Sequence, residues 1–180
     1  MIGLRVVPTD ELSRAELRTL REVLDRGFQD AFEGGFTDDD WAHTIGGTHV
    51  MAVEDEVVSH ASVVERQLMA GDRSLRTGYV EGVVTVTSRR NRGHASRVME
   101  EVGRIIARDY ELGALSTALP DFYARLGWQR WRGPTYARSP DGPIRTADED
   151  DGIMFLRTSV TANLDPTVPL TCDWRSGDLW

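Results

Sequence analysis

The sequence has little cysteine and no long apolar run. Its one cysteine, Cys172, cannot form an intrachain disulfide, and the cysteine and histidines do not follow the spacing of a zinc site. We therefore expect no metal centre. No window approaches the roughly 20 consecutive apolar residues of a membrane-spanning helix, and the first residues contain no apolar core of signal-peptide length. These absences predict a cytoplasmic protein with no membrane partner.

Net positive charge is also missing. The 180 residues include 29 acidic and 21 basic side chains, which gives a formal net charge of -8. This balance argues against non-specific binding to nucleic acid and favours a cationic small molecule or a basic partner. An acidic surface that serves no binding role is the alternative.

Linkers, repeats and low-complexity tracts are absent as well. The hydrophobic content of 40% is sufficient for a core that folds alone. We therefore expect residues 1–180 to form one domain.

Helix-capping signals and apolar periodicity locate the main helices. Ser13 and Glu16 form a capping box before a helix, and Thr37 is placed to cap a short second helix that ends at His43. A third helix is expected between Gly93 and Gly113. Its apolar face is formed by Val98, Met99, Val102, Ile105 and Ile106.

The remaining segments predict a mixed sheet. Strands are expected at residues 4–7, 48–54, 57–69, 74–87, 114–117 and 152–159, a further helix at 121–126, and irregular chain from residue 163. This order predicts a mixed α/β fold in which antiparallel strands come first and a β-α-β crossover follows.

The middle of the chain has the most informative pattern. A β-rich run ends in a segment of arginine and glycine, and an amphipathic helix follows at once. Gly93 and Ala95 lie where the chain enters that helix, among Arg89, Arg90 and Arg92. Free N–H groups at a helix N-terminus, the helix dipole and adjacent arginines together favour an anion. A plain helix-entry loop with solvated arginines is the alternative.

Gly82 interrupts the strand that leads into this loop. A glycine in mid-strand is typical of a bulge or of a ligand that approaches the backbone closely, although an ordinary irregularity is the alternative. A bulge would free a backbone N–H, such as that of Val83, to stabilise a developing oxyanion.

Acidic residues gather at 38–40, at 148–151 and at Asp178. Such clusters bind ammonium groups through charge-assisted hydrogen bonds, or else cap helices and face solvent. We expect Asp38 and Asp39 mainly to cap and to face solvent.

The C-terminal tail is apolar. Trp174, Leu179 and Trp180 are unusual in a frayed chain end, so we predict that the tail packs back onto the domain.

The spacing Arg90-x-x-Gly93-x-Ala95 resembles the acyl-coenzyme A pyrophosphate loop of the GNAT acetyltransferase superfamily. From about residue 28 to the last residue, the chain also resembles the aminoglycoside 2′-N-acetyltransferases. The segments that carry this resemblance are 36–49, 78–83, 112–116, 122–128, 131–135, 150–152 and 172–180. The last of these, and the acidic-aromatic segment around Trp41, are more specific than the loop.

The resemblance implies a GNAT acyltransferase fold with a mixed central sheet, antiparallel N-terminal strands, a β-α-β coenzyme-binding core and flanking helices. It implies a homodimer that transfers the acetyl group of acetyl-CoA to the 2′-amino group of a cationic aminoglycoside. The transfer is direct and needs no acyl-enzyme, so Cys172 is expected to be packed rather than nucleophilic.

The resemblance also implies roles for individual residues. Glu81 takes the position of a general base that acts through water, and Tyr123 that of an acid for the departing thiolate. A solvent-facing glutamate and a packed tyrosine are the alternatives. The implied coenzyme-binding residues are Val83, Val84, Val86, Arg90, Asn91, Arg92, Gly93, His94, Ala95 and Ser116. The implied acceptor-binding residues are Asp40, Glu81, Gly82, Asp150, Asp178 and Trp180, the last through a terminal carboxylate.

One departure concerns specificity. Relatives that act on 2-deoxystreptamine drugs have an acidic residue where this chain has Gly35. A smaller acceptor with fewer amines, such as kasugamycin, would need one carboxylate fewer. An acetyltransferase of a cellular amine and a catalytically silent GNAT-fold binding protein are the two rival functions.

Overall fold

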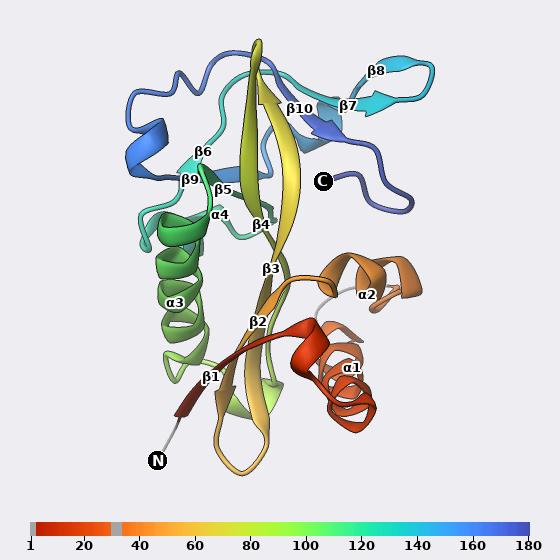
Figure 1. Ribbon diagram of the computed structural model, residues 1–180. Coiled ribbons are helices and arrows are strands. Elements are labelled where there is room, and N and C mark those ends of the chain that lie inside the picture. The colour runs from red at the N-terminus through yellow and green to blue at the C-terminus, as the bar shows by residue number, and fades with distance from the viewer. Residues whose placement is uncertain (1–2, 30–33) are drawn as a thin grey trace. The chain divides into compact units, whose positions relative to one another are not determined.

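The computed structural model describes residues 3–29 and 34–180 (Figure 1). Residues 30–33, which belong to the region of family resemblance, lie outside the described residues. The chain forms two compact units. The first unit comprises Met1–Val64 and Val80–Val102, and the second comprises Glu65–Tyr79 and Gly103–Trp180. Strands β3 (Val57–Ala70) and β4 (Arg73–Thr85) and helix α3 (His94–Asp109) contribute residues to both units.

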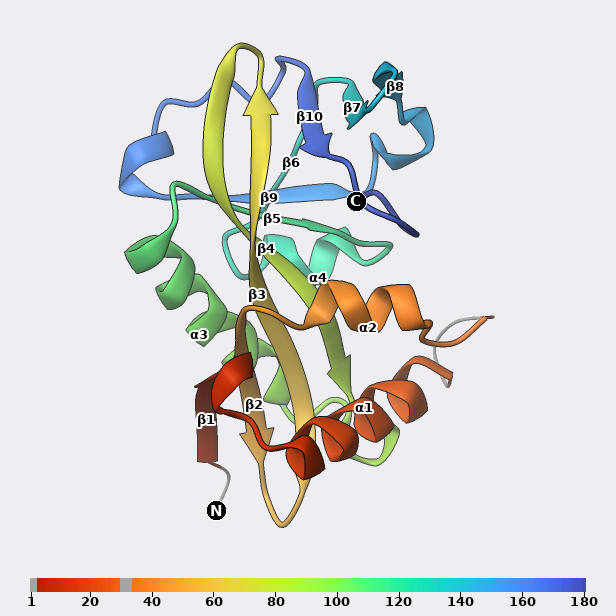
Figure 2. The ribbon, with the colours of Figure 1, turned by 45° about the vertical axis from the view of Figure 1, so that its right-hand side comes forward.

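The first unit begins with antiparallel strands, as predicted. Strand β1 pairs with β2, and β2 pairs with β3, so that Met51 lies opposite His60. Besides β3, β4 and α3, the elements of this unit are β1 (Gly3–Pro8), η1 (Thr9–Glu11), α1 (Arg14–Gln29), α2 (Asp38–Thr44), β2 (Thr48–Val53) and η2 (Thr87–Arg89). Helices α1 and α2 lie on one side of β2 and β3, and the first half of α3 lies on the other (Figures 1 and 2).

The apolar face of α1 forms one core of the first unit. The predicted capping box is confirmed: the Ser13 N–H donates to Glu16 Oε2 at 2.9 Å, and the Glu16 N–H donates to Ser13 Oγ at 3.3 Å. Leu20 and Leu24 are fully buried and pack with Met51 of β2 and Val84 of β4. The buried area of these side chains holds the helix against the strands.

The second unit contains the rest of the sheet. Strand β5 is parallel to β4, and the connection between them passes through α3, so the predicted crossover is confirmed. On one side β5 pairs with β9 and β9 with β6; on the other side β3 pairs with β10, β10 with β7, and β7 with β8. The elements are β5 (Leu112–Ser116), α4 (Pro120–Ala124), β6 (Gln129–Arg130), β7 (Thr135–Ser139), β8 (Gly142–Arg145), η3 (Ala147–Glu149), β9 (Ile153–Arg157), η4 (Ser159–Thr161) and β10 (Leu170–Asp173).

The sequence-based prediction of the second unit was wrong in two places. The third helix ends at Asp109, and Gly113 lies inside β5. The chain after residue 163 is not wholly irregular, because Leu170–Asp173 pairs with both β3 and β7. Short strands of this kind have little periodicity of their own and form because a neighbour supplies hydrogen-bond partners.

No helix in the described part of the chain is long and apolar enough to span a bilayer.

The first unit has a hydrogen-bonded polar chain in its interior. His49 and His60 are both 0% exposed, and His49 Nδ1 lies 2.9 Å from His60 Nε2. His60 Nδ1 lies 2.7 Å from the Gly82 carbonyl oxygen, and His49 Nε2 lies 2.8 Å from Thr9 Oγ1. Burial lowers the pKa of His49 to about 4. Burial, and secondarily the charge of His49, lower the pKa of His60 to about 3.

These two histidines make the protein sensitive to acid. Their folded-state pKa values lie below the ordinary value of 6.5. Below about pH 6.5 these histidines are therefore protonated in the unfolded chain while they are still neutral in the folded chain. Their contribution to stability is complete above about pH 6.5 and falls as the pH drops toward about 4, by up to ~1.4 kcal/mol per pH unit for each group. Urea unfolding from about pH 7.5 to about pH 4.5 should show this loss.

The control for this prediction is a histidine outside the polar chain. His43→Gln, on the half-buried face of α2, should keep the full pH dependence, whereas the double variant His49→Gln/His60→Gln should flatten it between about pH 6.5 and pH 5. An unchanged slope in the double variant would contradict the assignment.

Candidate active site

The arginine-glycine loop of the first unit opens helix α3. Asn91 and Gly93 have left-handed backbone angles, with φ of 61° and 79°, and α3 begins at the next residue. The Arg97 N–H donates to the Gly93 carbonyl at 3.1 Å, which closes the first turn. The N–H groups of that turn have no intrahelical acceptor, and together with the helix dipole they favour an anion.

The arginines of the loop differ in what they contact. Arg89 Nε donates to Glu54 Oε2 at 2.8 Å, and this bond is the main reason why the pKa of Glu54 is lowered. Arg90 donates to the carbonyls of Thr85 at 3.3 Å and Gly27 at 3.4 Å. Arg92 is exposed. The first two side chains therefore hold the loop in place, and Arg92 is best placed to meet an anion from solvent.

His94 is buried beneath the loop. Its side chain is 7% exposed, and Nε2 lies 3.6 Å from Glu54 Oε1. Neither ring nitrogen makes a hydrogen bond within the part of the chain that the structure describes. His94 can therefore contribute its backbone N–H to the helix N-terminus, but its ring packs in the interior.

Strand β4 changes conformation at Gly82, where φ is +58°. A Cβ atom on this residue would lie 3.0 Å from Thr44 Cγ2 and 3.4 Å from His60 Cε1, so only glycine fits both the space and the angle. The strand is therefore irregular at Gly82, a feature common to the predicted bulge and to its alternative. Glu81 and Val83 on either side are half-buried.

The other coenzyme-binding candidates of β4 lie just beyond. Val84 is 7% exposed and packs in the α1 core. Val86 follows the end of the strand, and its N–H donates to the Val58 carbonyl at 2.9 Å. The strand and the loop thus present backbone rather than these side chains to a ligand.

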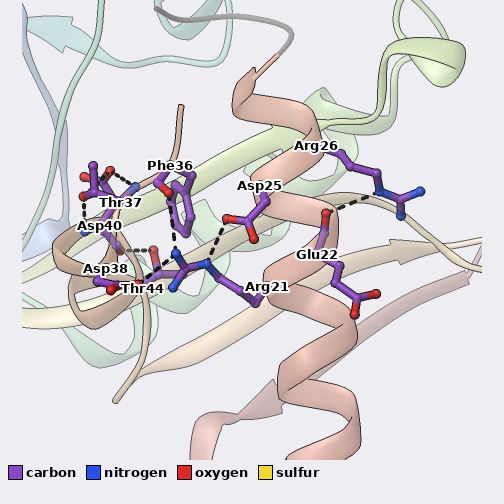
Figure 3. A network of polar contacts seen from close by, with 9 residues as sticks. All are labelled: Arg21, Glu22, Asp25, Arg26, Phe36, Thr37, Asp38, Asp40 and Thr44. Atoms are coloured by element: carbon purple, nitrogen blue, oxygen red, sulfur yellow. Dashed lines mark hydrogen bonds and ion pairs between the residues drawn. The ribbon is translucent and has the colours of Figure 1, made fainter. Parts of the chain in front are cut away.

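Asp40 caps helix α2. Its Oδ2 accepts hydrogen bonds from the Thr37 N–H and hydroxyl, both at 2.8 Å, and the Asp40 N–H donates to Thr37 Oγ1 (Figure 3). Asp38 and Asp39, expected to cap and to face solvent, lie in the first turn of α2 and are exposed. The Asp38 carboxylate also pairs with Arg21 at 3.1 Å, and the capping box uses Asp40, the third residue after the cap.

Arg21 joins this cap to helix α1. Its guanidinium pairs with Asp25 at 2.8 Å and with Asp38, and it lies over the rings of Phe36 and Trp41 (Figure 3 shows the polar contacts). The start of α2, and with it Asp40, is therefore fixed relative to α1. Gly35, in the loop before it, is half-buried with a φ of +67°.

Tyr123 lies in the second unit at the end of α4. Its side chain is 6% exposed and meets Phe122 and Trp128 edge to face. Burial raises the pKa of Tyr123 to about 12, although a hydrogen bond with Thr117 opposes the shift. The phenol therefore stays protonated near neutral pH and can donate a hydrogen bond.

Asp150 is already engaged within the second unit. Its carboxylate accepts the Thr135 N–H at 2.9 Å, the Thr135 hydroxyl at 2.9 Å and Arg145 Nη1 at 2.8 Å. The bond from Arg145 is the main reason why the pKa of Asp150 lies well below its usual range. Ser116, another candidate, donates to Glu149 at 3.1 Å.

The tail packs onto the second unit, as predicted. Trp180 is 5% exposed, and its Nε1 donates to Thr146 Oγ1 at 2.9 Å. Arg66, a buried cation, donates to the Leu179 carbonyl at 2.9 Å and pairs with Asp173 at 2.8 Å. Cys172 is fully buried, as expected.

Two tail residues face solvent. Trp174 is 48% exposed, contrary to the expectation that it would pack, and Asp178 is exposed. The tail is held by its backbone and by Trp180, so Trp174 is not needed for its anchoring.

The candidate residues thus divide between the units. The first unit holds Asp40, Glu81, Gly82, Val83, Val84, Val86 and residues 90–95. The second unit holds Ser116, Tyr123, Asp150, Asp178 and Trp180.

Sequence reasoning missed three residues that hold these segments: His49, His60 and Arg66. Each is a large polar side chain buried inside a strand whose other buried residues are apolar or small. That break in the pattern was the available signal, because a buried polar group must find a partner.

Comparison with known proteins adds the family. A model of the acetyltransferase (GNAT) domain matches residues 9–131, which is more than half of the chain. The aminoglycoside 2′-N-acetyltransferase of Mycolicibacterium fortuitum is 39% identical over 181 residues, which cover 98% of this chain and 91% of that protein.

Solved structures share the fold. The GNAT-family N-acetyltransferase YhbS of Escherichia coli, solved in complex with CoA, has a TM-score of 0.66 at 14% identity and covers 95% of this chain and 89% of its own. A GNAT-family acetyltransferase from Brucella melitensis, solved in complex with acetyl-CoA, has a TM-score of 0.63 at 12% identity, with 97% of each chain covered. The predicted GNAT fold is therefore confirmed.

The domain model matches most of the chain, and the identity to the Mycolicibacterium fortuitum protein extends along nearly all of it. The chain is a GNAT acetyltransferase and belongs to the family of the aminoglycoside 2′-N-acetyltransferases.

Proposed function

We propose that the protein transfers the acetyl group of acetyl-CoA directly to the 2′-amino group of an aminoglycoside. The observation that supports this most strongly lies in the first unit: one strand, β4, carries a half-buried carboxylate and a left-handed glycine and leads through η2 into the anion-binding loop of α3. A direct transfer needs these three features, namely a base, an oxyanion donor and a diphosphate site.

The residues of the first unit fit a coenzyme thioester. When bound, acetyl-CoA supplies an activated acetyl group. The N–H groups at the start of α3, with Arg92, would hold its diphosphate. The Val86 N–H and the Val84 carbonyl are already bonded to β3, so the remaining backbone groups of Val83, Val84 and Val86 would pair with its amide arm. Ser116 of β5 is the candidate contact from the second unit.

Glu81 is proposed as the general base. An ammonium group cannot attack a thioester until it loses a proton, and a carboxylate, or a water that it orients, can accept that proton. Glu81 is half-buried beside Gly82, and the Ser62 hydroxyl donates to its carbonyl at 3.4 Å. The backbone that presents the carboxylate is thereby tied to β3.

Tyr123 is proposed to assist the leaving thiolate. A phenol whose pKa is about 12 is a weaker acid than a thiol with a pKa of about 8.5, so complete proton transfer to the thiolate is uphill. Donation of a hydrogen bond avoids this cost. Tyr123 therefore contributes through hydrogen bonding and less than Glu81 does.

Asp40 and Asp178 are proposed as the main contacts to the cationic acceptor. Charge-assisted hydrogen bonds from ammonium groups supply both affinity and orientation. Asp150 already binds Arg145 and Thr135, so its charge is compensated before any acceptor arrives. Its proposed contribution, like that of Trp180, is to order the surrounding segment.

The glycine at position 35 predicts that the protein accepts fewer kinds of aminoglycoside than relatives with an acidic residue there. The expected carboxylate is missing at this position, so one ammonium group of a 2-deoxystreptamine drug has no partner. Kasugamycin, with fewer amines, is the acceptor that this departure favours. We further propose that residues 1–180 act as one domain, because the family match runs through both units. The homodimer is proposed from the family resemblance alone.

The first prediction of this function concerns turnover. Release of coenzyme A from acetyl-CoA should require an aminoglycoside, and NMR of the product should place the acetyl group on the 2′-amine. Glu81→Gln should lower kcat by roughly 10²–10⁴-fold while coenzyme affinity is kept, because only the base is lost. Glu56→Gln, in the exposed turn between β2 and β3, is the matched control and should be fully active.

Two results would contradict parts of this proposal. Coenzyme binding without turnover of tobramycin, gentamicin or kasugamycin would contradict the proposed acceptor class, and full activity of Glu81→Gln would remove its role as base.

The second prediction concerns the loop. Arg92→Ala should weaken acetyl-CoA binding about tenfold, because one charge-assisted hydrogen bond to phosphate is lost. Gly93→Asp should weaken it more, since it places a side chain at a φ of 79° and a negative charge at the helix N-terminus. Titration calorimetry measures both affinities.

The control is Arg138→Ala, which changes an exposed arginine of the second unit and should bind acetyl-CoA like the unmodified protein. Unchanged affinity in both loop variants would rule out the site.

The third prediction concerns specificity. Gly35→Asp restores a carboxylate, and among the described residues its Cβ would meet Gln29 Cγ at 3.6 Å. The φ of +67° strains this variant and its Asn control alike. The variant should raise kcat/KM for tobramycin by about fivefold and leave that for kasugamycin unchanged, because one more ammonium group gains a partner. Gly35→Asn, which has the same shape without the charge, is the control. An equal gain in both variants would show that charge is not the cause.

A further inference from the structure

The side chains of β3 bind the carbonyl groups of β4 around Gly82. Ser59 donates to the Val84 carbonyl at 2.9 Å, His60 to the Gly82 carbonyl at 2.7 Å, and Ser62 to the Glu81 carbonyl at 3.4 Å. All three β3 residues are 0% exposed. A buried polar side chain without a partner costs free energy, so these residues are tolerated because they satisfy backbone groups where the strand is irregular.

His60 makes the shortest of these bonds, and its partners fix its tautomer. The Gly82 carbonyl can only accept, so His60 Nδ1 carries the proton and Nε2 has the lone pair. His49 Nδ1 must then donate to His60 Nε2, which leaves His49 Nε2 to accept from the Thr9 hydroxyl at 2.8 Å. The Thr9 hydroxyl shares its proton between this nitrogen and the more distant Gly47 carbonyl at 3.1 Å. The Gly46 N–H donates to Thr9 Oγ1 at 2.9 Å and completes the chain.

This chain of hydrogen bonds runs in one direction and ends on a peptide group. Each bond polarises the next, so the Gly82 carbonyl receives a stronger donor than an isolated imidazole would provide. A carbonyl cannot carry a proton onward, so the chain holds geometry and does not conduct protons.

The Gly82 carbonyl and the Val83 N–H belong to the same peptide group. That group is planar and trans, so the N–H points in the direction opposite to the carbonyl. The bond from His60 therefore directs the Val83 N–H away from the imidazole and makes it a better donor.

We propose that His60 is a positioning residue for acetyl transfer: by holding the Gly82 carbonyl it aims the Val83 N–H at the thioester oxygen that gains negative charge. This inference rests on the proposed function, a direct transfer that needs an oxyanion donor, and it assigns that donor to the Val83 N–H beside Gly82. Thr44 supports the same arrangement, because a Cβ atom at position 82 would lie only 3.0 Å from Thr44 Cγ2. His60 and Thr44 thus both occupy the space that a side chain at position 82 would need.

Two substitutions at His60 separate positioning from packing. In His60→Asn the side-chain amide takes the place of Nδ1 and can still donate to Gly82, but it does not reach His49. In His60→Gln the amide takes the place of Nε2, so it meets His49 and leaves the Gly82 carbonyl. We expect His60→Gln to lower kcat with an aminoglycoside roughly 10- to 100-fold with both KM values unchanged, because the oxyanion donor acts in the transition state. His60→Asn should keep kcat within about fivefold.

The outcomes are distinguishable. Thermal unfolding of both variants and of His43→Gln, which should be fully active, shows whether kcat follows stability. Equal loss of kcat in the Asn and Gln variants, or full kcat in His60→Gln, would overturn the inference while the proposed function stands. If His60→Gln does not fold, a loss of kcat greater than about tenfold in a folded His60→Asn overturns it. Absence of turnover by the unmodified protein would overturn the proposed function and the inference together.

Discussion

The hydrogen bond between His60 and the Gly82 carbonyl is the interaction on which the geometry of β4 depends. A strand residue with a φ of +58° cannot make the regular ladder, so its backbone groups need other partners. The imidazole of His60 supplies one, and His49 and Thr9 hold the imidazole in turn. Glu81 and Val83, the proposed base and oxyanion donor, flank this point, so the conformation of one glycine sets the direction of both.

Charged side chains have different partners in the two units. In the first unit, Arg89 and Arg90 bind groups of the protein and Arg92 faces solvent, so the loop is held by two arginines and can offer a third to a phosphate. In the second unit, Arg145 neutralises Asp150, and Arg66 anchors the tail. The acidic clusters are therefore not equivalent: Asp150 is bonded to Arg145 and Thr135, whereas Asp178 is exposed.

Sequence reasoning succeeded where the determinants are local. The capping box of α1, the Thr37 cap of α2, the apolar stripe of α3 and the long strands β3 and β4 depend on neighbours within a few residues. It failed where a partner far along the chain decides the structure. Strand β10 forms because β3 and β7 lie beside it, and His60 reaches Gly82 only through the register of β3. Asp40 was predicted as an acceptor contact, and its role in the cap appeared only with the structure.

The most direct test of the buried polar chain is the protonation state of its histidines. Nitrogen-15 NMR of the side chains distinguishes the two neutral tautomers from each other and from the charged ring. Near neutral pH we expect both His49 and His60 to be neutral, with the proton on Nδ1 in each, and with the His60 proton shifted by its bond to Gly82. A proton on Nε2 alone in His60 would show that the ring does not donate to the Gly82 carbonyl and would contradict the account. A charged ring at either position would contradict the neutral chain of hydrogen bonds.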